Sequence, residues 1–457
     1  KLAVNTIRAI TPLDGRYATQ VSGLADHLSE WALIKRRVQV EVEWLLEMAG
    51  CADIADMRAL TASEQALLHG LVDDFDDDAA MQVKRIERTT NHDVKAVEYY
   101  IREKLAGTSM EDVCEWVHFC CTSEDINNLS HALMVKGALE EEWLPQARAL
   151  VDSVAALADA NADTALLART HGQAASPTTL GKELAVFVYR WRRQIRQIEN
   201  AEYLGKFNGA VGSYNAHAIA YPNADWHGIA RGFVERLGLT HNPLTTQIEP
   251  HDYLAEIFHA LIRFNTVMLD YDRDMWSYIS LGVFRQKAVE GEVGSSTMPH
   301  KVNPINFENS EANVGISSAL LEHLATKLPV SRLQRDLTDS SALRNLGPAI
   351  GHSLVGLKAA MRGLRQVAVD EDLLAAELDD AWEVLAEAVQ TVMRKQGAGD
   401  AYEMLKGFTR GRSVTGDDMR AFVGGLELPP DDKKRLMALT PAGYTGIAGE
   451  LVVRMDG

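Results

Sequence analysis

The feature that most constrains this fold is the length of its segments without glycine or proline. One such segment runs from His251 to Leu281 and another from Lys182 to Leu204. In both, apolar residues recur in steps of three and four, which places them on one face of an α-helix. At ~1.5 Å per residue the first helix would span on the order of 45 Å, longer than a compact single domain requires. Helices of this length are typical of long bundles, often shared between subunits.

The rest of the chain also favours helix. A third segment, from Glu111 to Pro145, is interrupted only by Gly137. Strand signals are scarce, because Asn208-Gly209 lies in a glycine-rich connection and not between two alternating runs. With 457 residues and 46% hydrophobic content, the chain can form roughly two to four domains with sizeable cores. We therefore predict an all-α fold.

Composition and charge argue against several classes of protein. The formal charge of -18, from 46 basic and 64 acidic residues, argues against a nucleic-acid-binding surface. No stretch approaches the roughly 18 uninterrupted apolar residues of a membrane-spanning helix, and the first residues lack the apolar core of a signal peptide. We therefore expect a cytoplasmic protein. An anionic substrate would need a local cationic pocket within this acidic chain.

Side chains suited to catalysis gather in the segment GSSTMPHKVNP, residues 294–304. Glycine relaxes the backbone there, whereas each proline fixes its own φ and favours extended geometry in the residue before it. The sequence therefore predicts an articulated loop that can close over a ligand and expel water. The alternative is an ordinary surface turn rich in Ser, Gly and Pro. The side chains in question are Ser295, Ser296, His300, Lys301 and Asn303.

The pattern G-S-S-x-M-P-x-K-x-N-P resembles the signature of the fumarase/aspartase superfamily, whose members eliminate fumarate from succinyl-type substrates. His300 at the variable position, followed by NFENSEAN, resembles the adenylosuccinate lyase family in particular. The resemblance extends from about residue 8 to about residue 448. It implies three helical domains, at residues 1–111, 112–367 and 368–457. The central domain would carry the loop and a five-helix bundle, which joins three further copies in the core of a homotetramer.

A second cluster, RTHGQAASP at residues 169–177, precedes a predicted long helix that begins near Thr178. An imidazole such as that of His171 can hold a proton near neutral pH and deliver it to a leaving nitrogen. A lone histidine at a helix entrance is more often a cap or a surface residue. The T-H-G-Q context, however, resembles the general-acid segment of the superfamily. Ala174 stands where many relatives have proline after the glutamine.

The resemblance also implies a reaction. Fumarate would be lost by β-elimination from adenylosuccinate, giving AMP, and from succinyl-aminoimidazole-carboxamide ribotide. Ser295 would be the general base, with Ser296 competing for that role, and His171 the general acid. No metal or organic cofactor is implied, and the chain has no H-E-x-x-H or P-loop motif. The alternatives are another fumarate-releasing lyase, such as argininosuccinate lyase or aspartase, and a catalytically silent helical scaffold.

Two further segments resemble substrate-contact segments of the adenylosuccinate lyase family. Asn91, His92 and Asp93 fall at what is predicted as a helix start, where the alternative is an Asn or Asp cap with a solvated charged face. Thr122 and Ser123 precede an acidic turn, which is also the pattern of a capping box. In the family the corresponding hydroxyls hold a carboxylate of the succinyl group.

The remaining implied contacts are dispersed along the chain. Arginine suits phosphate and carboxylate groups, although a surface salt bridge is its commoner role. The resemblance places Arg335, Ser340 and Arg344 near the nucleotide phosphate, and Arg16 with Tyr17 at the ribose-phosphate end. The other residues that it implies in substrate binding are Gln247, Ser296, Lys301, Val302, Asn303, Asn309, Ser341, Ala342 and Leu343.

Overall fold

The computed structural model describes residues 6–287, 298, 300–411 and 413–456. Helices dominate these ranges and the strands are short, so the all-α prediction is confirmed. The chain divides into two compact units. Unit 1 consists of residues 1–147, 194–266 and 312–358, and unit 2 of residues 148–193, 267–311 and 359–457. The three-domain division expected from the sequence remains a prediction.

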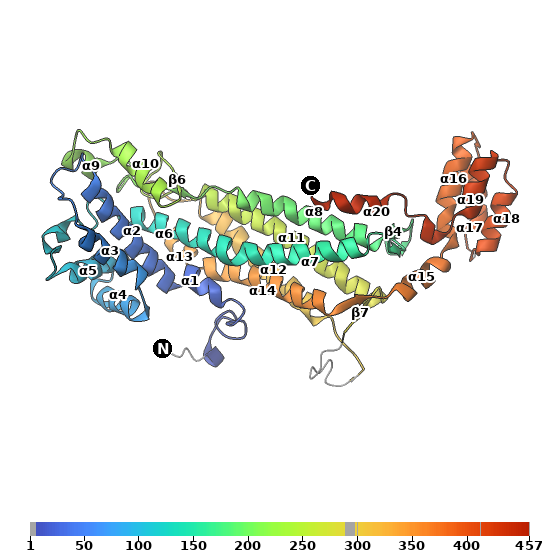
Figure 1. Cartoon of the computed structure of the whole chain (residues 1–457), viewed down its shortest axis with the longest axis horizontal. Coiled ribbons are helices and arrows are strands. Elements are labelled where there is room, and N and C mark those ends of the chain that lie inside the picture. The colour runs from blue at the N-terminus through green and yellow to red at the C-terminus, as the bar shows by residue number, and fades with distance from the viewer. Residues whose placement is uncertain (1–5, 288–297, 299, 412, 457) are drawn as a thin grey trace. The chain divides into compact units, whose positions relative to one another are not determined.

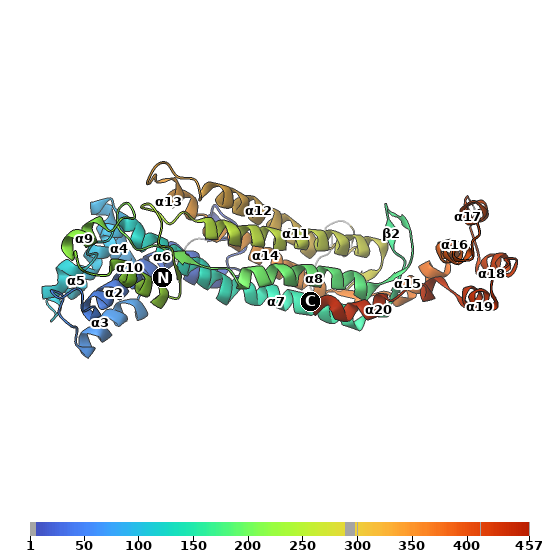
Figure 2. The ribbon, with the colours of Figure 1, turned by 90° about the horizontal axis from the view of Figure 1, so that it is seen from above.

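Several long helices, which Figures 1 and 2 label, contribute residues to both units. The segment from His251 forms a helix of 30 residues that ends at Leu281, as predicted. The segment from Lys182 forms a helix that ends at Glu199, earlier than predicted, because the chain then leads into a short strand at Leu204. These helices are α7 (Leu144–Ala160), α8 (Leu180–Glu199), α11 (Asp252–Leu281), α12 (Ile305–Lys327) and α14 (Leu346–Arg365).

The third predicted segment, from Glu111 to Pro145, is not one uniform helix. It begins with a 3-10 helix, η3 (Glu111–Trp116), and the α-helix α6 starts only at Ser123. Neither Gly137 nor Pro145 ends the helix, because a π-helical segment, η4 (Ala138–Trp143), connects α6 directly to α7. Proline has no backbone N–H to donate, and the wider π turn lies just where the α-helical hydrogen-bond ladder would lose that donor.

Helix starts in unit 1 follow local capping chemistry. Ser29 accepts a hydrogen bond from the amide of Ala32 at 3.1 Å, and Thr61 forms a capping box with Glu64. Such side chains satisfy amide groups that have no partner within the helix. The other elements of unit 1 are η1 (Thr6–Arg8), η2 (Ser22–Leu24), α1 (Ala25–Leu28), α2 (Glu30–Gly50), α3 (Ala62–Asp73), α4 (Asp77–Thr90), α5 (Asp93–Leu105), β5 (Leu204–Gly205), α9 (Asn215–Ala220), α10 (Trp226–Arg236), β6 (Thr240–His241) and α13 (Thr338–Leu343).

The core of unit 1 combines aromatic packing with a buried polar chain. The Trp44 ring lies 4.4 Å from that of Phe207 and 5.2 Å from that of Phe233, measured between centroids. Between the long helices, Trp143 Nε1 donates to Ser353 Oγ at 2.9 Å, and this hydroxyl donates to Asn265 Oδ1 at 2.8 Å. Because these buried polar groups satisfy one another's hydrogen-bonding needs, they fix the register of the helices with little loss of free energy from burying polar atoms.

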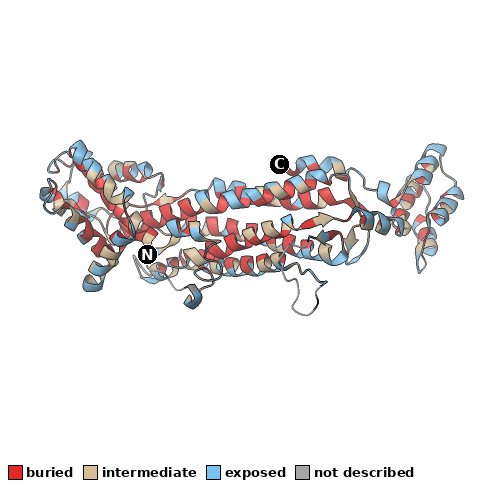
Figure 3. Ribbon diagram, turned by 60° about the horizontal axis from the view of Figure 1, so that its bottom comes forward, coloured by how far each residue is buried: buried red, intermediate tan, exposed pale blue. Residues whose placement is uncertain are grey.

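Unit 2 holds its parts of the long helices together by close ring contacts. The centroids of Trp191 and Tyr271 are 5.1 Å apart, joining α8 to α11. A Cβ atom added to Gly363 would lie 2.8 Å from the Phe307 ring, so α14 can approach α12 only because residue 363 is glycine. Figure 3 shows the buried positions on the mutually facing sides of the long helices.

The other elements of unit 2 are short strands and helices. The strands form antiparallel pairs, β1 with β4, β2 with β3 and β7 with β8. The helices α16 to α19 share an apolar cluster of buried residues. These elements are β1 (Ala165–Leu166), β2 (Arg169–Thr170), β3 (Gln173–Ala174), β4 (Thr178–Thr179), β7 (Phe284–Gln286), β8 (Val367–Val369), α15 (Glu371–Asp379), η5 (Trp382–Leu385), α16 (Ala386–Lys395), α17 (Ala401–Thr409), α18 (Gly416–Gly424), α19 (Pro430–Ala438), η6 (Pro441–Gly443), α20 (Ala448–Leu451) and η7 (Val452–Asp456).

Among the described residues, no single helix has the length and apolar character to cross a membrane. One bent pair of helical segments, 430–438 with 441–456, meets those criteria by length and composition alone.

Candidate active site

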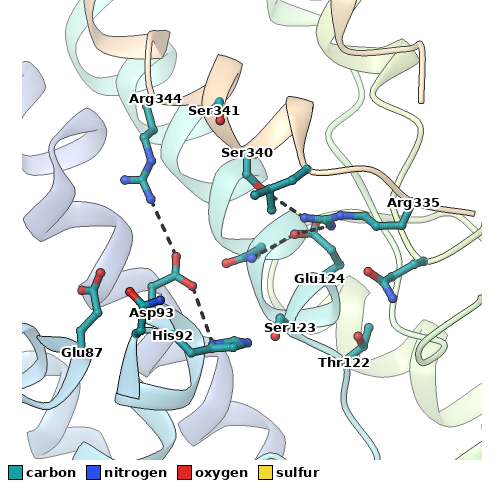
Figure 4. Close-up of a pocket in the computed structure, with 14 residues that line it drawn as sticks. Glu87, His92, Asp93, Thr122, Ser123, Glu124, Arg335, Ser340, Ser341 and Arg344 are labelled. Atoms are coloured by element: carbon teal, nitrogen blue, oxygen red, sulfur yellow. Dashed lines mark hydrogen bonds and ion pairs between the residues drawn. The ribbon is translucent and has the colours of Figure 1, made fainter. Parts of the chain in front are cut away.

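A cavity of about 500 Å³ opens in unit 1 (Figure 4). It brings together the end of α4, the starts of α5 and α6, the segment before α11 and the segment around α13, which are far apart in the sequence. The lining residues are Glu87, Asn91, His92, Asp93, Thr122, Ser123, Glu124, Asn127, Gln247, Arg335, Leu337, Ser340, Ser341 and Arg344.

The corner between α4 and α5 forms one wall of the cavity. Asn91 ends α4 in the left-handed conformation, with φ of 51°, which asparagine tolerates better than most residues. His92 is the N-cap of α5, and its Nδ1 accepts a hydrogen bond from the Lys95 amide at 3.1 Å. The expected cap is therefore present, but it is His92 and neither Asn91 nor Asp93. Asp93 is left with its carboxylate available for cationic partners.

Asp93 is held by arginine. Arg37, whose side chain is only 5% exposed, places Nη2 2.7 Å from Asp93 Oδ2, and Arg344 Nη2 lies 3.9 Å from the same oxygen. Burial alone would raise the pKa of Asp93, but the charge and hydrogen bond of Arg37 outweigh it and hold that pKa below its usual value. Asp93 is thus ionised at neutral pH.

The start of α6 forms the opposite wall. The Thr122 amide donates to Asp125 Oδ2 at 2.9 Å, as expected of the predicted capping box. The Asp125 carboxylate is fully buried and also forms an ion pair with Lys206 Nζ at 2.7 Å. This pair anchors the first turn of α6, so that Thr122, Ser123 and Glu124 are presented to the cavity on a rigid backbone.

Arg335 lies between the cavity and the buried interior of unit 1. Its Nη1 is 2.7 Å from Glu124 Oε1, and its Nη2 donates to Ser340 Oγ at 3.1 Å (Figure 4). Glu124 in turn accepts from Asn127 Nδ2 at 3.0 Å, and Asn127 Oδ1 accepts from Arg37 Nε at 2.8 Å. The two arginines are therefore tied into one network of ion pairs and hydrogen bonds that spans both walls.

The charge of the lining differs from the expected cationic pocket. Three carboxylates, those of Glu87, Asp93 and Glu124, face two guanidinium groups, those of Arg335 and Arg344. The expectation of a pocket with excess positive charge is therefore wrong for the lining described. One physical reason is that Arg335, whose side chain is 18% exposed, requires a counter-ion, and Glu124 provides it at 2.7 Å.

A smaller cavity of about 150 Å³ adjoins the first and shares Asp93, Asn127, Ser340 and Arg344 with it. Its own lining includes Leu343 and His131. Burial, together with the nearby positive charge of Arg37, lowers the pKa of His131 to about 3, so this imidazole is neutral. Of the residues implied at 340–344, Leu343 lines only the smaller cavity and Ala342 lines neither.

His171 lies in unit 2, at the turn of the hairpin formed by β2 and β3. With φ of 53° at His171 and 74° at Gly172, the two-residue turn has the left-handed backbone that suits a tight hairpin. The long helix predicted to begin near Thr178 is present as α8, which starts at Leu180, but His171 belongs to the hairpin that precedes it and does not cap the helix. The imidazole is exposed, and Arg169 at the base of the hairpin pairs with Glu377 at 2.8 Å.

The predicted loop lies only partly within the described residues. Ser295 and Ser296 are outside them. Lys301 and Val302 are exposed, Asn303 is half-buried, and Gln286 Nε2 donates to the Val302 carbonyl at 2.6 Å. Besides Ala342 and Leu343, the described residues that were expected to bind substrate but do not line the larger cavity are Arg16, Tyr17, Lys301, Val302, Asn303 and Asn309.

Several cavity residues were not anticipated from the sequence. Glu124 and Asn127 closely follow Thr122 and Ser123 in the segment CTSEDINN, residues 121–128, where the acidic residues suggested only a helix cap. Glu87 lies four residues before Asn91, and Leu337 lies two residues after Arg335. Proximity to a substrate-contact motif was the available signal for all of them. No local signal pointed to Arg37, whose role depends on packing across unit 1.

In the described part of the chain, no group of three or more His, Cys, Asp or Glu side chains is arranged to hold a metal ion.

Comparison with known proteins identifies the class of protein to which this chain belongs. Residues 15–316 match the lyase family, and residues 331–445 match the family described as adenylosuccinate lyase C-terminal. Among solved structures, the fold is similar to that of fumarate lyase from Mesorhizobium sp. BNC1 (TM-score 0.76, 17% identity, 95% of this chain and 97% of that one). It is also similar to 3-carboxy-cis,cis-muconate lactonizing enzyme from Pseudomonas putida (TM-score 0.73, 23% identity, 95% and 96%). Fold and sequence together define a helical lyase, as the resemblance to the fumarase/aspartase superfamily predicted.

Curated relatives narrow this class. Adenylosuccinate lyase of Escherichia coli K12 is 53% identical over 452 residues, covering 99% of both chains. Adenylosuccinate lyase of Haemophilus influenzae is 52% identical over 456 residues, covering 100% of both. The chain belongs to the adenylosuccinate lyase family.

Proposed function

We propose that this protein catalyses the β-elimination of fumarate from adenylosuccinate, giving AMP, and from succinyl-aminoimidazole-carboxamide ribotide. The observation that carries the proposal is the full-length identity of 53% with the Escherichia coli adenylosuccinate lyase. The two substrates share the succinyl-amine group on which the bond cleavage occurs. A cavity of about 500 Å³ is of the size of pockets that bind small molecules.

In this proposal the cavity of unit 1 binds the substrate. Arg335 and Arg344, with Ser340, bind the phosphate, since guanidinium groups offer paired donors to its oxygens. Thr122 and Ser123 donate their hydroxyls to a succinyl carboxylate. Arg335 is already held by Glu124 and Ser340, so little side-chain freedom is lost when an anion binds.

Two residues would perform the proton transfers. Ser295 removes a proton from the carbon next to a carboxylate, and Lys301 and Asn303 stabilise the negative charge that develops on the carboxylate oxygens. The carbon-nitrogen bond then breaks, and the electron pair stays with the departing nitrogen. His171 delivers a proton to that nitrogen, which completes the release of fumarate. The exposed position of His171 leaves its ring accessible to such a substrate.

We further propose that each active site is completed by other copies of the chain in a homotetramer. The cavity lining of unit 1 carries three carboxylates against two arginines, whereas the substrate has a phosphate and two carboxylates. Additional cations are therefore needed, and exposed residues such as Lys301 and Arg16 would supply them from neighbouring copies. The reaction and its substrates accord with a cytoplasmic location.

The test is to incubate the purified protein with adenylosuccinate and to follow both the loss of substrate absorbance and the release of fumarate. We expect turnover at micromolar enzyme or below. Argininosuccinate and aspartate, offered in parallel, identify the alternative lyases by the same release of fumarate. A protein that releases fumarate from none of these substrates would be the silent scaffold, and the proposal would be wrong.

A further inference from the structure

A buried histidine stands behind the cavity of unit 1 without lining it. His251 precedes α11 and is 2% exposed. Its φ is 64°, a backbone conformation that is uncommon for a residue other than glycine. The His251 amide donates to Glu249 Oε2 at 2.7 Å, and its ring Nε2 lies 3.3 Å from Asp339 Oδ2. The ring contact places this imidazole against Asp339 of α13.

Asp339 connects that imidazole to the cavity. Its Oδ1 accepts a hydrogen bond from the Ser340 amide at 2.7 Å and lies 3.8 Å from Arg335 Nη2. Burial alone would raise the pKa of Asp339, but the hydrogen bond from His251 and the charge of Arg335 hold that pKa below its usual value. The carboxylate is therefore ionised and can only accept hydrogen bonds, so the proton between the two side chains belongs to His251 Nε2.

His251 and Asp339 together influence the position of the Arg335 guanidinium. Its guanidinium lies between Glu124, at 2.7 Å from Nη1, and the Asp339–Ser340 pair on the side of Nη2. Without a fixed Asp339, the guanidinium would be held only by the charge of Glu124 and by the Ser340 hydroxyl. A second layer of hydrogen bonds commonly orients the groups that touch a ligand in this manner.

We propose that His251 is a positioning residue for anion binding. It holds Asp339 in place, and Asp339 holds Arg335 and the Ser340 backbone in the orientation that receives the phosphate of the nucleotide. This inference rests on the proposed function, which supplies the nucleotide. A merely structural role for His251 would lower stability but would not distinguish ligands with a phosphate from ligands without one.

The experiment compares the binding of AMP and adenosine by calorimetry in the full-length protein. His251→Leu preserves volume and removes the donor, and we expect it to weaken AMP binding about tenfold while adenosine changes less than about twofold. The KM for adenylosuccinate should rise by a similar factor, with kcat little changed. His251→Gln, whose amide nitrogen can donate from a similar position, should recover most of the AMP affinity.

A matched control is His352→Leu. His352 is also buried, 7% exposed, and its Nδ1 lies 2.9 Å from Asn313 Oδ1, but it does not line the cavity. We expect this variant to leave the ratio of AMP to adenosine affinity unchanged. If it shifts that ratio as much as His251→Leu does, general loosening explains the effect and the inference is overturned.

If His251→Leu does not fold, Asp339→Asn tests the same positioning role. It keeps an acceptor for the Ser340 amide but removes the charge beside Arg335, so the same AMP-specific loss is expected. Equal losses for AMP and adenosine, or no loss for either, would overturn the inference. If the wild-type protein releases fumarate but these variants bind AMP normally, only the role of His251 is refuted. If the wild-type protein releases no fumarate, the proposed function itself is refuted.

Discussion

The two units hold their functional side chains in opposite ways. In unit 1, Arg335 is 18% exposed and its counter-ion Glu124 is 5% exposed, so this proposed phosphate-binding group is largely buried and already paired. In unit 2, His171 stands at an exposed hairpin turn, and Lys301 is exposed as well. Under the proposed function, ligand binding is organised within one unit, whereas the proton transfers depend on side chains presented outward. Substitutions in the two units should therefore change different kinetic constants.

The largest expected effect comes from His171→Ala. Loss of the proposed general acid should lower kcat on the order of 10³-fold, because the departing nitrogen can no longer be protonated in the transition state. AMP affinity, measured by calorimetry, should stay within about twofold of the wild type. His323→Ala, at an exposed histidine on α12, serves as the control and should retain full activity. A variant that loses AMP binding together with kcat would remove the distinction between the units.

Substitution of the two neighbouring serines tests the assignment of the base. Ser295→Ala should abolish turnover to a similar degree and retain substrate binding, whereas Ser296→Ala should remain active. Steady-state rates with adenylosuccinate provide the measurement. Normal turnover by Ser295→Ala together with an inactive Ser296→Ala would transfer the role of base to the second serine.

Mixed oligomers test whether outward-facing residues of unit 2 complete the cavity of another copy. His171→Ala and Arg335→Met should each be impaired, but dissociation and reassociation of an equal mixture should restore about a quarter of the sites. This fraction follows if two copies contribute independently and each is intact half of the time. Sedimentation establishes the oligomeric state of the mixture. No recovery above the more active parent would show that each site is built from one chain.

Arg335→Met addresses binding within unit 1. Removal of the guanidinium leaves the Glu124 carboxylate without its cationic partner beside the proposed phosphate. We expect the KM for adenylosuccinate to rise about thirtyfold, with a smaller change in kcat. Arg332→Met is the matched control, because Arg332 is 80% exposed and pairs with Asp336 outside the cavity. A comparable KM increase in both variants would mean that Arg335 acts only through the overall charge.

The smallest expected effect concerns the pH dependence of stability. Burial alone would lower the pKa of His118. The charge of Glu41, whose Oε1 lies 2.5 Å from His118 Nδ1, and the hydrogen bond between these atoms outweigh burial and raise that pKa above its usual value. A group whose pKa is raised by folding stabilises the protein fully at low pH, and this contribution is lost as pH rises through the raised value. The free energy of unfolding should therefore decline as pH increases above about 6.5. His118→Gln should flatten this decline in urea titrations, and an unchanged slope would contradict the assignment.

Part of this molecule could be predicted from local patterns. The segment from His251 to Leu281 formed the predicted helix, and the capping-box pattern at Thr122 correctly located the start of α6. The π-helical continuation through Pro145 could not be predicted, because proline usually interrupts a helix and nothing local indicates the wider turn. Similarly, His92 became the cap of α5 although Asn and Asp are the stronger capping residues.

The amino-acid sequence by itself determined the helical class, the family and most of the residues around the cavity, because helix periodicity, capping and motifs act over a few neighbouring positions. Only the tertiary structure decided which charges meet. Glu124 pairs with Arg335, Arg37 pairs with Asp93, and His251 supports Asp339, although the partners are far apart along the chain. Such pairs form when packing removes them from water, since a buried charge must then find a partner wherever the fold supplies one.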